Sequence, residues 1–170
     1  MVMGLLLPIS TFSMTTLCYC DSKLAFARCC EPLLKGKLLA PTAEALMRSR
    51  YCAYVLGDFQ YILNTYSQAK RRDLSLAVLQ QDANETQWLA LQVESHQLTE
   101  PGATVQFSAF YRYDGQLYKL HELSRFIIEE GHWRYVDGQM LDDCGKLRLG
   151  RNDSCFCGSN KKFKQCCGKN

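Results

Sequence analysis

The chain has 170 residues, of which 47% are hydrophobic and 22% are charged. This length and balance suit one globular domain with small appendages, and they exclude two full-sized domains, collagen, a coiled coil and wholesale disorder. No apolar run reaches the ~18 residues that would span a bilayer, so we expect no membrane insertion. The net charge of +3 excludes no class of partner by itself, and the ten cysteines are the unusual feature of the composition.

Residues 1–17 form an N-terminal extension whose status the sequence leaves open. The stretch from Met3 to Leu7 is apolar like the core of a signal peptide, but no Lys or Arg precedes Lys23 and no small-residue cleavage site follows. An alternative is that Met14 is the true start. We expect a cytoplasmic protein, because an export signal is missing and thiolate ligands need a reducing compartment.

Eight of the ten cysteines fall into two clusters, and both clusters have the spacing C-x-C-x8-C-C. Phe26 and Phe163 occupy the same offset within the two clusters, as do Ser22 and Ser159, which indicates an internal repeat. The clustered residues are Cys18, Cys20, Cys29 and Cys30 near the start, and Cys155, Cys157, Cys166 and Cys167 near the end. Cys52 and Cys144 lie outside; Cys52 is most simply a core residue.

Four cysteines at this spacing can hold a zinc ion. Sulfur ligands lie about 2.3 Å from zinc, so the chain must bring neighbouring sulfurs to about 3.8 Å. Cysteines two residues apart in an extended segment face one side, and a short helix beginning near Asn160, capped by Ser159, would return the adjacent pair. We therefore predict two zinc ions per chain, in an N-terminal knuckle at 18–40 and a C-terminal knuckle at 145–170.

Two other readings of the cysteines compete with zinc. A disulfide framework is usual for a small secreted chain with an even number of cysteines, but adjacent residues such as Cys166 and Cys167 are awkward disulfide partners. An iron–sulfur cluster also takes four cysteines, although its familiar spacings differ. Asp21 stands where the C-terminal unit has Gly158, which weakens the prediction for the N-terminal unit.

Between the knuckles, residues 41–144 change from a helical to a strand period. Thr42 is the predicted N-cap of a helix that stops at Gly57, a second helix starts at Asp58, and a third starts at Asp73. Alternation then predicts strands at 86–98, 104–113, 116–128 and 132–137, with hairpin turns at Asp114-Gly115 and Glu130-Gly131. We predict an α+β cone domain with a curved antiparallel sheet wrapped on the helices.

Four segments carry a resemblance to a known family. The segments are Leu46–Tyr51, Glu122–Phe126, Trp133–Gly138 and Gly150–Gly168. The first three resemble the YchJ family, and the two cysteine units resemble the SEC-C zinc motif at the tail of the SecA translocase. The resemblance covers residues 18–170 and implies a central domain like nuclear transport factor two; the family has no assigned reaction.

The sequence departs from that family pattern at two places. Tyr19 and Phe156 stand where proline is usual between the first two cysteines, so that turn is less rigid. The run at 65–68, Thr-Tyr-Ser-Gln, replaces the family's Thr-Trp-His-Pro, which removes any role of that histidine. By fold analogy, the cone can hold a pocket at the open end of its sheet. The candidate pocket residues are Arg48, Arg50, Glu122, Arg125 and Asp137, and at least one of Arg48 and Arg50 is expected to form a structural ion pair with Glu122 or Asp137.

Charge is distributed unevenly along the chain. Residues 145–170 carry seven basic residues against Asp153, whereas residues 41–144 carry nine basic and fourteen acidic residues. The C-terminal knuckle is therefore the basic part, and its Lys161, Lys162, Lys164 and Lys169 could meet an acidic protein or a ribonucleoprotein. The competing interpretation is a solvated lysine-rich surface that keeps the tail soluble. Direct RNA binding has weaker support.

Two functions from different classes follow. The favoured one is a zinc-binding module for interaction with a protein or the ribosome, in which the metal is structural. The alternative is a small enzyme with an unidentified substrate in the cone pocket. The sequence favours the binding role because no spacing of candidate residues dictates a reaction, and it identifies no catalytic residues.

Overall fold

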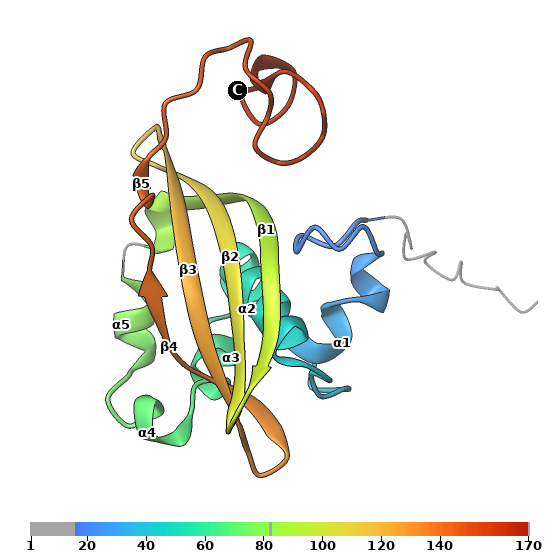
Figure 1. The fold of residues 1–170 in the computed structure, drawn as a ribbon, viewed down its shortest axis with the longest axis vertical. Helices are drawn as coiled ribbons and strands as arrows, with labels where there is room; N and C mark the ends of the chain where they lie inside the picture. The colour runs from blue at the N-terminus through green and yellow to red at the C-terminus, as the bar shows by residue number, and fades with distance from the viewer. Residues whose placement is uncertain (1–15, 82, 170) are drawn as a thin grey trace, which may run out of the picture.

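A curved antiparallel sheet encloses helices on its concave side in the computed structural model, which describes residues 16–81 and 83–169 (Figure 1). Four long strands pair in sequence order: β1 (Thr86–Thr99), β2 (Gly102–Tyr113), β3 (Gln116–Glu129) and β4 (His132–Met140). A short β5 (Gly145–Lys146) pairs with β3. Within the described ranges, no helix combines the length and apolar character that crossing a bilayer requires. The predicted α+β class is confirmed.

The main helix, α2 (Ala43–Leu56), begins and ends where the sequence predicts. The Thr42 side chain accepts a hydrogen bond from the backbone N–H of Ala45, which satisfies one of the free donors of the first turn. Gly57 ends the helix with a φ of 72°, a left-handed conformation that glycine adopts without steric cost. The predicted cap and stop residues are thus both confirmed.

The smaller helices depart in part from prediction. Asp58 caps α3 (Phe59–Asn64) as predicted, but the third helix does not start at Asp73. The chain instead forms α4 (Gln68–Arg71) and α5 (Leu76–Gln80), and serines directly before them serve as the caps. A serine hydroxyl accepts the N-terminal N–H groups as well as an aspartate does, which explains the displacement. The knuckles contain α1 (Glu31–Leu34) and 3-10 helices at Phe26–Arg28 and Phe163–Gln165, and a third 3-10 helix spans Ala83–Glu85.

The core lies between α2 and the concave face of the sheet. Alternate residues of β2 point inward and are buried, as the period of two predicts. They meet apolar side chains of α2, including Leu46 and Met47, and fully buried Phe126 of β3. The inward residues of β2 are Ala103, Val105, Phe107 and Ala109. This packing places α2 across the cone and orients its arginines.

We predict that Thr42→Ala lowers the free energy of unfolding by about 1 kcal/mol, because it removes the side-chain acceptor at the N-terminus of α2. Thr42→Ser, which retains the oxygen, is the matched control and is expected to stay close to wild type. Urea denaturation followed by circular dichroism measures both. Equal stability of wild type and Thr42→Ala would contradict the assigned cap.

Candidate metal centres

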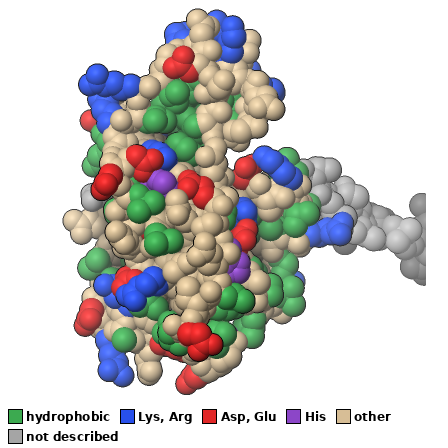
Figure 2. Space-filling view, in the orientation of Figure 1, with side chains coloured by type: hydrophobic (Ala, Val, Ile, Leu, Met, Phe, Trp, Pro, Cys, Tyr) green, Lys and Arg blue, Asp and Glu red, His purple; other side chains and the backbone are tan. Residues whose placement is uncertain are grey.

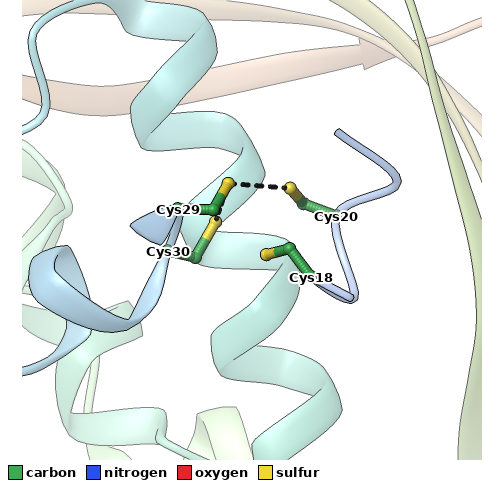
Figure 3. A group of neighbouring side chains, drawn as sticks. All are labelled: Cys18, Cys20, Cys29 and Cys30. Atoms are coloured by element: carbon green, nitrogen blue, oxygen red, sulfur yellow. Dashed lines mark hydrogen bonds between the residues drawn. The ribbon is translucent and has the colours of Figure 1, made fainter. Parts of the chain in front are cut away.

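The N-terminal cysteines converge from two short segments beside α2 (Figure 3). The sulfur atoms of all four lie within 4.8 Å of one another. Cys20 Sγ lies 3.6 Å from Cys29 Sγ, and Cys29 Sγ lies 3.8 Å from Cys30 Sγ. These separations match the sulfur spacing of a tetrahedral thiolate site.

The C-terminal cysteines form a second group of the same kind, and their sulfurs also lie within 4.8 Å of one another. Cys157 Sγ is 3.4 Å from Cys155 Sγ and 3.3 Å from Cys166 Sγ. Cys166 and Cys167, adjacent in the chain, hold their sulfurs 4.0 Å apart. All ten cysteines are free thiols, so the disulfide reading has no geometric support.

The backbone repeats from one knuckle to the other. An antiparallel bridge joins Leu17 to Ala25, and the equivalent bridge joins Ser154 to Lys162. Asp21 has a φ of 60° where Gly158 has 72°, and aspartate tolerates this left-handed region better than most residues. The substitution that weakened the N-terminal prediction is therefore accommodated without changing the turn.

The repeated serines contact the metal-ligand candidates and do not cap a helix. Ser22 Oγ lies 3.1 Å from Cys29 Sγ, and Ser159 Oγ donates to Cys166 Sγ at 3.2 Å. The predicted helix beginning near Asn160 is wrong: the only helical turn in this segment starts at Phe163 and has no side-chain cap. A hydrogen bond to sulfur stabilises negative charge on a thiolate ligand.

The sulfurs influence one another's protonation. Hydrogen bonds from Cys18 and then Cys30 hold the pKa of Cys20 far below that of an ordinary thiol, which favours a thiolate there. Burial, followed by the hydrogen bond with Cys155, raises the pKa of Cys167. A bound metal ion requires all four thiolates, so loading the sites releases protons and is weakened by acid.

The N-terminal tetrad is part of the protein core. Cys18, Cys20 and Cys30 are buried with residues of α2. Cys52, on that helix, places its sulfur 3.6 Å from Cys18 Sγ and thus supplies a fifth sulfur beside the site. The sequence interpretation of Cys52 as a core residue missed this contact, because its spacing from the cluster carries no signal.

The C-terminal knuckle instead lies on the outer face of the sheet near one end of the cone (Figure 1). Phe156 stacks on Phe110 of β2 with ring centroids 4.6 Å apart and an interplanar angle of 18°. Gln92 donates a hydrogen bond to the carbonyl of Phe156, and Arg112 Nη2 donates to the carbonyl of Cys167 at 3.2 Å. Phe156, which stands where the family usually has proline, therefore supplies the ring that packs the knuckle against the sheet.

Arg48 belongs to the N-terminal knuckle and not to the predicted pocket. Its Nη1 donates to the carbonyl of Cys20 at 2.7 Å, and its Nε donates to Glu44 at 2.8 Å. Residues two apart on a helix point to different sides, so Arg48 and Arg50 separate. Arg48 thereby joins the sulfur site to α2.

Arg125 and Asp137 also lie away from the cone interior. They pair with each other on the outer face of the sheet, where both side chains are exposed. Successive strand residues face opposite sides, so Arg125 points outward between buried Ser124 and Phe126. Of the five pocket candidates, Arg50 and Glu122 line the central cavity. The expected ion pair of Arg48 or Arg50 with Glu122 or Asp137 is wrong: Arg48 pairs with Glu44, Asp137 pairs with Arg125, and no ion pair joins Arg50 or Glu122 to another described residue.

Comparison with known proteins supports this architecture. Residues 42–138 match the family model described as YchJ, middle NTF2-like domain. The chain belongs to the YchJ family. Residues 151–169 match the SEC-C motif, which agrees with metal binding by the C-terminal tetrad.

Two relatives align with about nine-tenths of this chain. A UPF0225 protein from Actinobacillus succinogenes is 40% identical over 157 residues, covering 91% of this chain and 98% of that protein. A UPF0225 protein from a Shewanella species is 43% identical over 161 residues, covering 89% and 96%. These relatives carry no functional name.

Two solved structures share the fold. A SEC-C motif containing protein from Rhodopseudomonas palustris superposes with a TM-score of 0.70 at 35% identity, covering 75% of this chain and 100% of that one. A second, from Psychrobacter arcticus, has a TM-score of 0.65 at 31% identity and covers 91% and 97%. The NTF2-like fold implied by the sequence resemblance is confirmed.

We predict that Phe110→Ala releases the C-terminal knuckle from the sheet, because the stack with Phe156 is removed. Trypsin should then cut faster at the basic residues of the knuckle that precede its cysteines, Lys146, Arg148 and Arg151, as measured by limited proteolysis and mass spectrometry. Thr104→Ala, on the same strand and face but remote from the knuckle, is the control. Unchanged cleavage of Phe110→Ala would contradict docking through this stack.

Proposed function

We propose that each tetrad holds one zinc ion and that zinc shapes both ends of the chain. The observation that carries this proposal is the convergence of four sulfurs within 4.8 Å at each end. Four protein ligands complete a tetrahedron and leave no open position for substrate, as in structural zinc sites. When bound, zinc would supply the cross-link that a segment this short cannot obtain from a hydrophobic core.

Metal content tests this part of the proposal. Native mass spectrometry of untagged protein should find two zinc ions per chain, and Cys20→Ser or Cys157→Ser should each remove one. Cys144→Ser is the matched control, because Cys144 lies outside both tetrads and contacts the backbone of His121 instead. Metal-free wild-type protein, or an iron–sulfur cluster at either end, would contradict zinc.

The second part of the proposal is that the C-terminal knuckle is a docking surface for an acidic partner in the cytoplasm. Its lysines Lys161, Lys162, Lys164 and Lys169 are all exposed, and none forms an ion pair with another described residue. Figure 2 shows basic side chains gathered on this end of the molecule. The knuckle thus presents positive charge on a unit held against the cone.

The aromatic residues of the knuckle favour an acidic protein over exposed nucleic-acid bases. Sequence-tolerant RNA binding combines basic residues with aromatic rings on which bases stack. Phe156 is already stacked on Phe110, and Phe163 lies beside it with centroids 6.0 Å apart. Both rings are half-buried, whereas the lysines are exposed, so the lysines are the principal recognition elements.

Charge reversal tests the docking surface. The triple change Lys161→Glu, Lys162→Glu and Lys164→Glu should abolish retention of cytoplasmic partners in crosslinking pull-downs, because it inverts the charge of the surface. The matched control is Lys70→Glu, Arg71→Glu and Arg72→Glu, which inverts an exposed basic run at α4. Ribonuclease treatment distinguishes a ribosomal partner from a protein. Identical partners for both triple variants would contradict the proposal.

A further inference from the structure

The cone contains a cavity of about 340 Å³ between α2 and the inner face of the sheet. This volume lies in the lower part of the range for small-molecule sites. Its walls are mainly aromatic, and Met140, half exposed at the end of β4, stands at its edge. The ring-bearing residues include Tyr51, Tyr54, Tyr66, Trp88, Phe107 and Tyr135.

Glu122 places a carboxylate in this apolar space. It is 6% exposed, and its Oε1 accepts hydrogen bonds from Ser124 Oγ at 2.5 Å and from the Tyr135 hydroxyl at 2.9 Å. Burial, followed by the charge of Glu122, raises the pKa of Tyr135, so that hydroxyl stays protonated and donates. Both of these hydrogen bonds go to Oε1; Oε2 accepts none from any described residue, and Glu122 lines the cavity.

The neighbouring strand leaves room for this carboxylate. Gly138 of β4 pairs with Ser124, and a Cβ at Gly138 would overlap the side chain of Glu122. A larger residue would displace the carboxylate from the cavity wall. The position of Glu122 therefore depends on the absence of a side chain across the strand pair.

Arg50, the other buried charged residue of the cavity wall, has partners of its own. Its Nη1 donates to the carbonyl of Ile62 at 2.9 Å and to Thr65 Oγ1 at 2.6 Å, at the C-terminal end of α3. Its guanidinium carbon lies 4.5 Å from the ring centroids of both Tyr66 and Tyr135. Carbonyls and ring faces both compensate positive charge, whereas Glu122 has only two neutral donors.

We propose that this cavity binds a small organic cation with an apolar aromatic body, whose ammonium group donates to Glu122 Oε2. A cation would complete the hydrogen bonding of a buried carboxylate, and the rings would attract both its charge and its apolar surface. Burying a carboxylate without a counter-charge is costly, so the chemistry of the cavity wall favours a cationic ligand over a neutral one. This site is independent of the sulfur tetrads.

Three probes of nearly equal shape test the proposal on the full-length, metal-loaded protein. Phenethylamine, 2-phenylethanol and 3-phenylpropanoate differ only in the terminal group, which is cationic, neutral or anionic. Titration calorimetry, with NMR for weak binding, should show phenethylamine binding about tenfold or more tightly than the alcohol. Tighter binding of 3-phenylpropanoate would make Arg50 the anchor and overturn the proposal, as would no binding of the amine.

Glu122→Gln separates charge from shape. The amide oxygen can still accept from Ser124 and Tyr135, so we expect amine affinity to fall about tenfold while affinity for the alcohol changes less than twofold. Asp137→Asn is the matched control, because it removes an exposed carboxylate from the same sheet. If Glu122→Gln and Asp137→Asn lower the affinity for phenethylamine equally, the effect comes from general surface charge and the proposal is overturned. If Glu122→Gln does not fold, the comparison of the three probes on the wild-type protein tests the proposal.

Discussion

The convergence of four sulfur atoms is the constraint on which both ends of the chain depend. Outside the tetrads, the described part of each knuckle has an isolated bridge, one 3-10 turn and a few backbone hydrogen bonds, such as those from Cys18 to Leu24 and from Cys155 to Lys161, both 2.8 Å. The N-terminal knuckle adds the single-turn helix α1, and the C-terminal knuckle adds the two-residue strand β5. Such segments bury too little apolar surface to offset the entropy of ordering their backbones. Thiolates this close repel one another unless they are protonated or share a cation, so the observed geometry is most stable with a bound ion.

The two knuckles have the same internal structure but different relations to the cone. The N-terminal tetrad is buried against α2, where Arg48 and the sulfur of Cys52 contact it. The C-terminal tetrad is partly exposed and is joined to the sheet chiefly by one ring stack. This asymmetry suits a structural role for the N-terminal tetrad. It suits the proposed docking role for the C-terminal tetrad, whose knuckle carries the exposed lysines. The cavity inside the cone lies apart from both and offers a separate binding chemistry.

Much of this organisation could be predicted from residues that act locally. Thr42 and Gly57 delimit α2 because capping and left-handed turns depend on the residue itself, and period-two alternation predicts all four long strands. The cysteine spacing predicts both tetrads, because the same C-x-C-x8-C-C spacing occurs at both ends of the chain. Local signals failed where two residues had equal chemistry, as when Ser75 rather than Asp73 capped a helix.

Contacts between distant segments could not be predicted. Nothing near Cys52 indicates that its sulfur meets Cys18, and nothing near Phe156 indicates that its ring meets Phe110. The separation of Arg50 from Arg48 followed from helix geometry, but which of them would face the cavity required the packing of α2 on the sheet. These relations depend on tertiary structure, which sequence spacing does not encode directly.

Hydrogen exchange of the metal-loaded and metal-free protein tests the central claim most directly. The informative amides are those of Cys29 and Cys166, which donate to the carbonyls of Phe26 and Phe163 at 3.0 Å in the two knuckles. The account predicts protection at both positions only with metal bound, while amides of β2 stay protected in either form. Equal protection of both knuckles without metal would show that they hold their shape unaided and would contradict the account.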